Sequence, residues 1–470
     1  MKFDVRNGGI MMRKIIVLLV TITFMFPISV FGQAAGQHVQ KRKMLSTTQN
    51  TSQKRYYAKG NNSTKVSANK PSSAKPAFPS GQAAVNSSSN TILPMNVEYK
   101  ILDNISKTCE VVGCKDNPIT SPNIPLKIDG YTVVSIGKDA FKERKDVKKI
   151  VIPSSVNKIS DFAFEYCRNL TSIEIPYNVK EIGAYAFSSC WELISAIFPN
   201  SVTSIGKSAF SFSGLSSIAI PSSVTKIDSN PFFKSNRLSS IVVEKNNPVY
   251  DSRNNCNAII ETKSNKLVVG CKSTIIPDDV IIIGESALSY ELLTIKIPKN
   301  VAIIMKSAFW GAPETVISIT VDPNNKYYDS RNGCNAIIET STNTLIVGCR
   351  NTVIPNNVVC IKEDAFAYCH TLKAVNLPSN LISIGNNAFR TCYDLTTITI
   401  PQTVTSIGND AFWDCRSLKT VICKVTNPFF LGNNAFLHLP SDAILYVPIG
   451  TKSAYEQKGW GKYFSTIVER

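Results

Sequence analysis

The segment "IPSSVNKISDFAFEYCRNLTSIEIP" (Ile152–Pro176) begins and ends with the same dipeptide, and the next segment, "IPYNVKEIGAYAFSSCWELISAIFP", repeats its pattern. Pro153, Pro176 and Pro199 lie 23 residues apart. Each segment follows V-x-x-I-G-x-x-A-F-x-x-C-x-x-L-x-x-I-x-I-P, with apolar residues at fixed positions. A fixed period of about 20–50 residues is typical of a solenoid in which each repeat forms one coil.

The pattern recurs about eleven times, and we call the position after its alanine the Phe slot. A single coil buries about six apolar side chains, each worth about 1.5–3 kcal/mol. Ordering its residues costs about 1–2 kcal/mol each in backbone entropy, so a coil needs stacked neighbours to be stable. The Phe slot holds Phe141, Phe164, Phe187, Phe210, Phe232, Phe309, Phe366, Phe389 and Phe412, with Leu288 once and Phe436 in a last, altered copy.

The local pattern predicts two elements in each coil. "LTSIEI" (Leu170–Ile175) ends in alternating apolar residues, which predicts a short strand that stops at Pro176. "AYAFSSC" (Ala184–Cys190) predicts one or two helical turns. We therefore expect an α/β solenoid with short parallel strands and short helical turns. The glycine of the pattern is replaced in some copies, which indicates that it serves close packing and is not required for a left-handed backbone. Those copies carry Ser160, Asp228, Met305 and Lys362.

Two coils carry insertions, near residues 244–276 and 321–354. "YDSRNNCNAIIETKSNKLVVGC" (Tyr250–Cys271) and "YDSRNGCNAIIETSTNTLIVGC" (Tyr328–Cys349) align without gaps at an offset of 78 residues. Each predicts a β-hairpin that extends a sheet or projects from one face. The shared "YDSRN" is open to two interpretations, a recognition loop or a structural turn, and we prefer the turn.

The thirteen cysteines fall into groups. Five occupy one slot of the repeat and are expected to stack as small, buried, free thiols. Cys256–Cys271 and Cys334–Cys349 lie across the two hairpins, and their spacing is compatible with a disulfide and with free thiols alike. The cysteines of the repeat slot are Cys167, Cys190, Cys369, Cys392 and Cys415.

The first 95 residues differ in composition from the rest of the chain. Met12-Arg13-Lys14 precedes the apolar run Ile15–Phe26, which is shorter than the roughly 20 residues of a membrane span. Residues 1–32 therefore predict a cleaved signal peptide, with an uncleaved membrane anchor as the alternative, and no later segment is apolar enough to span a bilayer. Residues 33–95 are rich in Ser, Asn and Lys and predict a disordered basic linker.

Most of the positive charge lies in this N-terminal part. Residues 1–95 contain thirteen Lys and Arg against one acid, which gives +12 of the total charge of +17 and leaves about +5 for the other 375 residues. The folded part is therefore close to neutral, which argues against a nucleic-acid-binding face on the fold.

The string "SVTSIGKSAF…LSSIAIPSSV" (Ser201–Val224) resembles the BspA-like leucine-rich repeat family of bacterial surface proteins, and the resemblance covers about Val97–Arg470. It implies a right-handed leucine-rich-repeat solenoid, export or surface display, and adhesion to host matrix proteins, to other bacteria, or to both. We expect an N-terminal cap over residues 96–130, repeats over 131–423, and an altered repeat with a C-terminal cap over 424–470. In that cap, the aromatic residues Tyr455, Trp460 and Phe464 are expected to cover the last coil.

The sequence contains no pattern typical of catalysis. Its three histidines are His38, His370 and His438, and none belongs to a recognisable triad or metal motif. His370 follows Cys369, but Cys369 fills a repeat slot, so we interpret it as a core residue. We therefore predict no enzyme activity and assign no catalytic, cofactor-binding or metal-binding residue.

The strand side of the coils is the expected working surface. Its outward positions are small and rich in hydroxyl groups, which suits broad contact with an extended polypeptide or glycan, or simply a soluble strand. We expect a secreted or cell-surface protein that mediates protein–protein interaction; the alternative is an envelope or secreted scaffold held to acidic polymers by its basic tail. The candidate partner-binding residues are Thr171, Ser172, Glu174, Ser216, Ser217, Lys373, Asn376, Thr396, Thr397 and Thr399.

Overall fold

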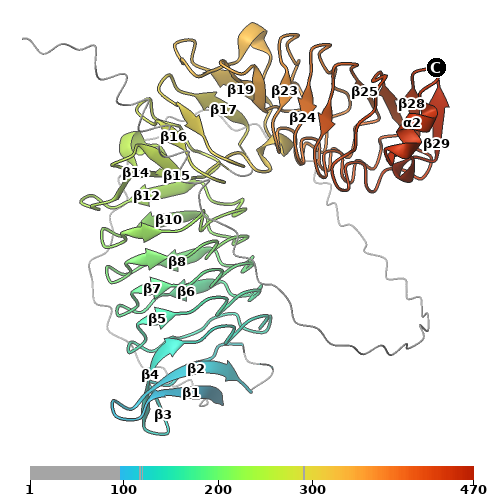
Figure 1. The fold of residues 1–470 in the computed structure, drawn as a ribbon. Helices are drawn as coiled ribbons and strands as arrows, with labels where there is room; N and C mark the ends of the chain where they lie inside the picture. Colours follow the sequence, from blue (N-terminus) through green and yellow to red (C-terminus); the bar gives the residue numbers. More distant parts are fainter. Residues whose placement is uncertain (1–95, 116–117, 119, 289–291) are drawn as a thin grey trace, which may run out of the picture. The chain divides into compact units, whose positions relative to one another are not determined.

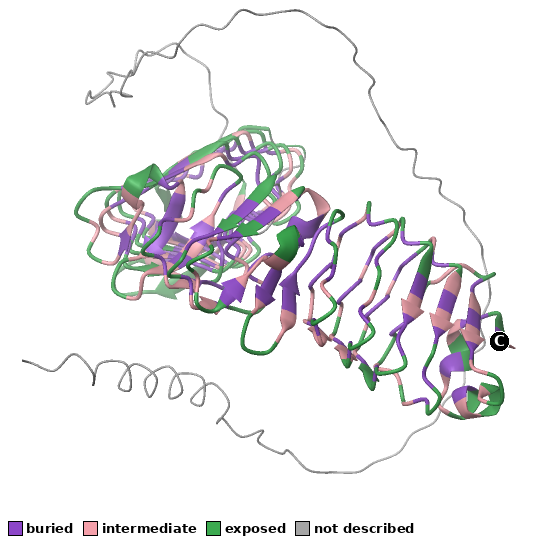
Figure 2. Ribbon diagram, turned by 90° about the horizontal axis from the view of Figure 1, so that it is seen from above, coloured by how far each residue is buried: buried purple, intermediate pink, exposed green. Residues whose placement is uncertain are grey.

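The computed structural model describes residues 96–115, 118, 120–288 and 292–470. The predicted signal peptide and basic linker lie outside these described residues. Figure 1 shows the described chain as a succession of stacked coils, and Figure 2 shows buried residues lining their interior. Within this part of the chain, no helix has the length and apolar character needed to cross a lipid bilayer.

In most coils the I-x-I part of the repeat forms a short strand, and these strands pair in parallel, as predicted. Ile218 of one coil lies beside Ile241 of the next, and both are buried, while the residues between the buried positions face outward. We call this set of strands the I-x-I column. It contains β6 (Ser172–Glu174), β8 (Ser195–Ile197), β10 (Ser217–Ile220), β12 (Ser240–Val243), β17 (Thr294–Ile297), β19 (Ser318–Val321), β25 (Thr397–Ile400) and β27 (Thr420–Cys423).

A second short strand in each coil comes from the residues before the glycine, and the sequence patterns did not separate it from the neighbouring apolar segment. In these strands the isoleucine pairs with the equivalent isoleucine of a neighbouring coil, as Ile159 does with Ile182. We call this set the I-G column. It contains β5 (Lys158–Ile159), β7 (Glu181–Ile182), β9 (Ser204–Ile205), β11 (Lys226–Ile227), β16 (Ile282–Ile283), β18 (Ile303–Ile304), β23 (Cys360–Ile361), β24 (Ser383–Ile384) and β26 (Ser406–Ile407).

The prediction of a short helix in each coil is wrong, because the residues around the Phe slot form consecutive turns. Phe162 and Tyr166, two residues before and after Phe164, have φ angles of 59° and 61°, which no α-helix contains. Their N–H groups donate to Ala184 and Ser188 of the next coil, at 2.9 and 2.8 Å. The backbone therefore forms its hydrogen bonds between coils in place of the i to i−4 bonds of a helix.

The Phe slots of successive coils form a buried aromatic stack. The ring centroids of Phe164 and Phe187 are 5.1 Å apart with nearly parallel planes, and those of Phe389 and Phe412 are also 5.1 Å apart. The rings stack in this way from Phe141 to Phe232 and again from Phe366 to Phe436. Because coils bury apolar side chains against their neighbours, the core runs along the stack, in three apolar clusters that meet at the two insertions.

Each insertion folds as an antiparallel hairpin within the I-G column. In the first, β13 (Tyr250–Asp251) and β14 (Ala258–Glu261) precede β15 (Lys266–Gly270), which pairs in parallel with β16. The second repeats this arrangement with β20 (Tyr328–Asp329), β21 (Ile337–Glu339), β22 (Thr344–Val347) and β23. The hairpins therefore extend the column, and they do not project from it.

The hairpins also interrupt the aromatic stack. Gly270 donates its N–H to Ala287 and Gly348 donates its N–H to Ala365, which is the bond that a Phe-slot residue makes in an ordinary coil. A Cβ atom on Gly348 would lie 2.2 Å from the ring of Phe366. Glycine is therefore needed there, because the ring of the next coil occupies the space of the missing side chain.

The "YDSRN" residues satisfy one another within each hairpin. Asp251 accepts hydrogen bonds from the guanidinium and the main-chain N–H of Arg253, and Thr262 donates to the same carboxylate. The hydroxyl of Tyr250 accepts the N–H of Ile227 at the end of β11. The Arg253 guanidinium holds the pKa of the Asp251 carboxyl below its usual value, against the opposing effect of burial. These contacts support the interpretation of the motif as a structural turn.

Additional elements lie at both ends of the stack. At the first end, β1 (Val97–Asp103) pairs with β2 (Thr108–Cys114), which pairs with β4 (Tyr131–Ile136), and β3 (Lys127–Ile128) joins β4. At the last end are β28 (Ile444–Val447), α2 (Lys452–Gln457), the 3₁₀ helix η4 (Trp460–Tyr463) and β29 (Thr466–Glu469). The buried ring of Trp460 packs against Phe436, 6.0 Å between centroids.

Three short 3₁₀ helices complete the described elements: η1 (Arg253–Asn255), η2 (Ala312–Glu314) and η3 (Arg331–Gly333). Of these, η1 and η3 belong to the equivalent "YDSRN" turns, and η2 lies between Phe309 and β19.

Candidate partner-binding face

The outward positions of the I-x-I column, with the equivalent residues of coils that lack a regular strand, form a surface that we call the strand face. The predicted residues lie on it in successive coils, and most are exposed because side chains alternate between the two sides of a strand. Exposed residues are Ser172, Glu174, Ser216, Ser217, Lys373, Asn376, Thr396 and Thr397, and half-buried ones are Thr171 and Thr399.

Large apolar side chains also lie on the strand face, and the sequence analysis missed them. Ile194, Ile197, Val242 and Leu293 are 51–65% exposed and occupy the same outward positions as the hydroxyl residues. The repeat pattern fixes the buried positions and does not restrict the outward ones. Only a comparison of the residues at each outward position, coil by coil, would have shown these apolar side chains. The strand face is therefore more apolar than predicted, which favours contact with protein.

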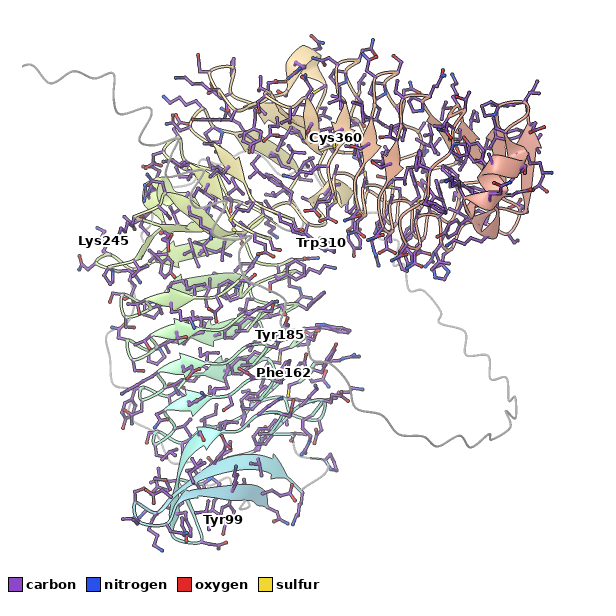
Figure 3. All side chains as sticks on the ribbon, viewed as in Figure 1. Tyr99, Phe162, Tyr185, Lys245, Trp310 and Cys360 are labelled. Carbon is purple, nitrogen blue, oxygen red and sulfur yellow. The ribbon has the colours of Figure 1, made fainter. Side chains whose placement is uncertain are left out.

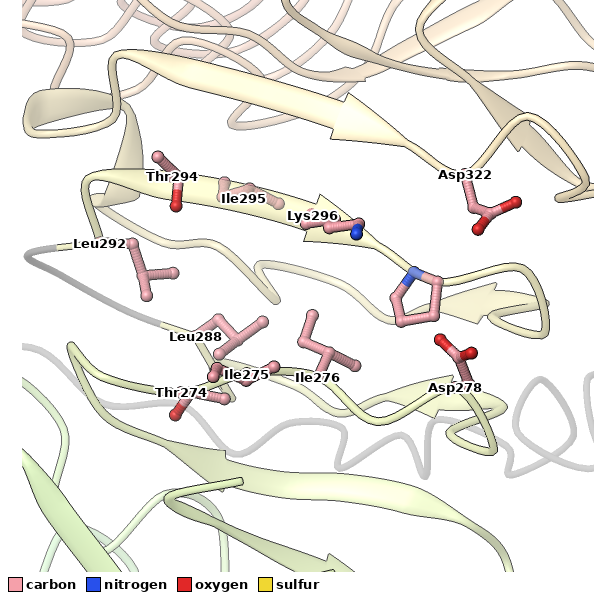
Figure 4. Close-up of a pocket in the computed structure, with 11 residues that line it drawn as sticks. Thr274, Ile275, Ile276, Asp278, Leu288, Leu292, Thr294, Ile295, Lys296 and Asp322 are labelled. Carbon is pink, nitrogen blue, oxygen red and sulfur yellow. The ribbon is translucent and has the colours of Figure 1, made fainter. Parts of the chain in front are cut away.

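A hollow of about 310 Å³ interrupts the strand face beside β17 (Figure 4). Ile275, Ile276 and Leu288 line one side of it, and the outer surface of β17 lines the other. The carboxylates of Asp278 and Asp322 lie at the same end of it, and Lys296 of β17 also lines it. The hollow thus joins an apolar floor to charged groups, two carboxylates and one ammonium group.

The strands around the insertions differ in how their outer edges are covered. Ser252 accepts the N–H of Val243 in β12 at 3.0 Å, and Ser330 accepts the N–H of Val321 in β19 at 3.1 Å. By contrast, β17 pairs with β19 alone among the described strands, so its edge toward the preceding coil carries no strand partner. The hollow therefore borders an open strand edge in the middle of the face.

The four hairpin cysteines are unpaired in the structure. The thiol of Cys256 donates to Ala258 and that of Cys271 donates to Asn257, and Cys334 and Cys349 repeat this arrangement. The two thiols of each hairpin thus point to different carbonyl groups and do not bond to each other. Disulfides between them stay a prediction for the oxidised chain.

The described histidines lie in aromatic and polar contacts. His370 is stacked on Tyr393 at 4.4 Å, and its Nδ1 lies 3.2 Å from a carboxylate oxygen of Glu314. Burial raises the pKa of the neighbouring Cys369 thiol to about 12, so this thiol stays protonated at neutral pH. His438 contacts Trp413 edge-on. His38 lies outside the described residues.

The chain matches the family model of the BspA type leucine rich repeat region, with six copies, over residues 134–260, 259–345 and 347–449. The chain belongs to this family. A comparison with curated proteins gives no match. Membership of this family is consistent with protein–protein interaction.

Solved structures with a similar fold come from several bacteria. A leucine-rich repeat protein from Bacteroides ovatus is 25% identical, with 81% of this chain and all of that chain covered and a TM-score of 0.38. The pneumococcal vaccine antigen PcpA is 18% identical, with 81% and 98% covered and a TM-score of 0.45. A leucine rich cell surface protein from Faecalibacterium prausnitzii is 20% identical, with 79% and 96% covered and a TM-score of 0.40.

Proposed function

We propose that this chain is an exported or cell-surface protein that binds extended segments of other proteins through its strand face, and that adhesion to host matrix proteins or to other cells is its role. The observation that carries the proposal is the open edge of β17 beside the apolar hollow. Membership of a surface-protein repeat family supports it.

Binding at this edge would proceed by strand addition. An extended peptide forms main-chain hydrogen bonds with the free edge, and its alternate side chains enter neighbouring pockets. Here the pocket lined by Ile275, Ile276 and Leu288 takes an apolar side chain. The two carboxylates at its end, from Asp278 and Asp322, favour a basic residue close by in the partner segment.

The substitution Ile275→Asp tests this site. Ile275 is 73% exposed, so its replacement leaves the core intact, while a carboxylate in the hollow opposes apolar contact. We expect binding to immobilised matrix proteins to weaken about tenfold or more, equivalent to about 1.4 kcal/mol, in surface plasmon resonance.

Val353→Asp is the matched control for Ile275→Asp. Val353 occupies the equivalent position of the second insertion, 78 residues later, and is also 73% exposed, but it does not line the hollow. Affinity should be unchanged by Val353→Asp. Equal losses in the two variants would contradict a specific site at β17.

The alternative role, a scaffold held to acidic polymers by residues 33–95, rests on the charge of +9 in those residues, which contain nine Lys and Arg and no acid. A variant distinguishes this role from binding through the strand face. In it, Gln replaces Lys41, Arg42, Lys43, Lys54 and Arg55. Binding that disappears in this variant and in high salt, and survives Ile275→Asp, would favour the scaffold role.

A further inference from the structure

The turn side of the coils, which carries the Phe slots, presents a second regular surface. The residues two before and two after each Phe slot have positive φ angles in most coils, and their side chains form two columns. The larger side chains in these columns are partly exposed, whereas Ser189 and Ser208 are buried. Tyr185 and Phe212 belong to these columns, with φ angles of 57° and 55°. Figure 3 shows Tyr185 beside Phe162 on the same side of neighbouring coils.

A hollow of about 350 Å³ opens between these columns. Its aromatic lining includes Tyr185 and Phe212, and its floor is made of serine side chains. Two of these, Ser188 and Ser211, are buried and are hydrogen-bonded to each other at 2.9 Å. The volume lies in the range of about 300–1,000 Å³ that is common for small-ligand sites.

The hollow exists because, in each column, a coil with an aromatic residue lies next to a coil with a small residue in the same slot. Tyr185 stacks on Phe162 with ring centroids 5.2 Å apart, but the next coil places Ser208 in that slot. In the other column, Ser189 precedes Phe212. Among the described residues, therefore, one ring face of Tyr185 carries no aromatic neighbour on the side toward the hollow.

In the later coils, Asn387 and Asp410 take the slot of Tyr185, and Thr391 and Asp414 take the slot of Phe212, while aromatic rings at neighbouring positions lie beside arginines. The guanidinium of Arg390 lies 4.0 Å from the ring centroid of Trp413, and Arg416 lies over Tyr393. Arg416 also forms a two-bond pair with Asp414. In those coils arginines thus cover the rings. In the earlier coils Lys234 lies 5.3 Å from the ring centroid of Phe212 and Phe233 meets that ring edge-on, whereas Tyr185 stacks on Phe162 alone among the described aromatic rings.

The chemistry of the lining identifies the class of ligand. An aromatic face attracts the C–H groups on one side of a sugar ring, because the face carries partial negative charge. Serine hydroxyls donate and accept, which matches the hydroxyl groups at the rim of the same sugar. Glu165 is paired with Lys142 at 2.9 Å, which leaves Glu285 and Lys207 as one charge of each sign around the hollow, so its charge is close to balance. A charged ligand gains little there.

We propose that this hollow is a glycan-binding site that takes a neutral sugar ring against Tyr185, with the serine hydroxyls and the ring of Phe212 completing the contact. This site lies on the turn side, and the protein-binding site proposed above lies on the strand face.

The test is a binding measurement on the mature chain with neutral soluble polysaccharides. Affinity electrophoresis through gels that contain mannan, xyloglucan, laminarin or hydroxyethylcellulose reports retardation by any of the four. We expect retardation by at least one of them, and an apparent affinity at least about tenfold lower, or about 1.4 kcal/mol, in Tyr185→Asn and in Phe212→Ser. Both replacements suit a positive φ, since Asn387 and Ser189 occupy the same slots with φ of 53° and 60°.

Two controls make the result specific. Tyr177→Asn removes an exposed tyrosine outside the hollow, and it should leave retardation unchanged. Ile275→Asp should reduce matrix-protein binding without affecting retardation. Absence of retardation by all four polysaccharides, or retardation that survives the double variant Tyr185→Asn/Phe212→Ser, would overturn the proposal. Loss of matrix-protein binding in that double variant would also overturn it, by making the hollow part of the protein interface.

Discussion

At the scale of single residues, the repeat selects small donors for the slot that cysteine usually fills. Cys190 donates its thiol to the carbonyl of Phe164 at 3.2 Å, one coil earlier, and Cys415 does the same to Phe389 at 3.1 Å. Where the slot holds Ser235, the hydroxyl donates to Phe210 at 2.8 Å. The sequence predicted small buried groups here, and the structure adds that the thiol or hydroxyl donates to the preceding coil at these positions, although Ala312 occupies the same slot without a side-chain donor.

Burial gives these thiols a pH dependence. It raises the pKa of Cys167 from its ordinary value of 9.0 to about 12, so the unfolded state loses this proton first as the pH rises. The contribution of this thiol to the free energy of unfolding is therefore fully present below pH 9 and is lost as the pH rises from 9 to 12. Between pH 8 and pH 10 the free energy of unfolding of the unsubstituted chain should fall because of this thiol, and that of Cys167→Ser should not. We expect the fall in Cys167→Ser to be smaller by about 1.4 kcal/mol.

Urea unfolding at the two pH values measures this difference. Cys114→Ser provides the comparison, because Cys114 lies in β2 and is only half-buried. Identical pH dependence in Cys167→Ser and the unsubstituted chain would show that the thiol ionises as easily in the folded state as in the unfolded one.

The pattern glycines follow the expectation drawn from their replacement in other copies. Gly183 and Gly385 do not have positive φ angles. A Cβ atom on Gly183 would lie 2.5 Å from the main-chain nitrogen of Asp161 in the preceding coil. The glycine thus allows two coils to approach closely. The sequence could predict a packing role, because Met305 and Lys362 fill the same slot and would not suit a left-handed backbone.

At the scale of elements, the hairpins act as partitions in the core. Ile337 of β21 packs into the middle apolar cluster, whereas its neighbour Ile338 packs into the last one. A strand with both faces buried needs consecutive apolar residues, which explains "NAII" in both insertions. The sequence predicted the hairpins, but their alignment with the I-G column depends on contacts with coils far along the chain.

A buried tyrosine ends the strand ladder in front of the second hairpin. The hydroxyl of Tyr328 accepts the N–H of Ile304 in β18 at 3.0 Å. Tyr328→Phe leaves this buried N–H without its acceptor, which costs about 1–3 kcal/mol. We expect a lower urea midpoint in circular dichroism, while Tyr327→Phe, at a neighbouring exposed position, should leave the midpoint unchanged. A midpoint that does not move in Tyr328→Phe would mean that water replaces the hydroxyl.

At the scale of the whole molecule, the stack is stable only if its last coil is covered. Trp460 is completely buried, and its indole N–H donates to the carbonyl of Phe429 at 2.9 Å. Tyr455 donates to Val425 at 2.7 Å, which ties α2 to the last coil. These side chains cover apolar groups that a further coil would otherwise cover.

Removal of this cover should destabilise and expose the stack. We expect Trp460→Ala to lower the free energy of unfolding by about 3–5 kcal/mol and to increase light scattering on storage. Trp191→Ala is the comparison, because Trp191 is 48% exposed, and it should change stability by less than about 0.5 kcal/mol. Similar losses in both variants would show that the end of the stack needs no special cover.

The sequence by itself determined the repeat, the buried positions and the parallel stacking. Pro176, Phe164 and Ile173 each recur at one period, and residues that recur at one period must meet their equivalents in the next coil. Tertiary structure alone decided the turns around the Phe slot, the open edge of β17 and both hollows. These features depend on which groups of neighbouring coils hydrogen-bond or leave space, and the pattern within one coil does not contain that information.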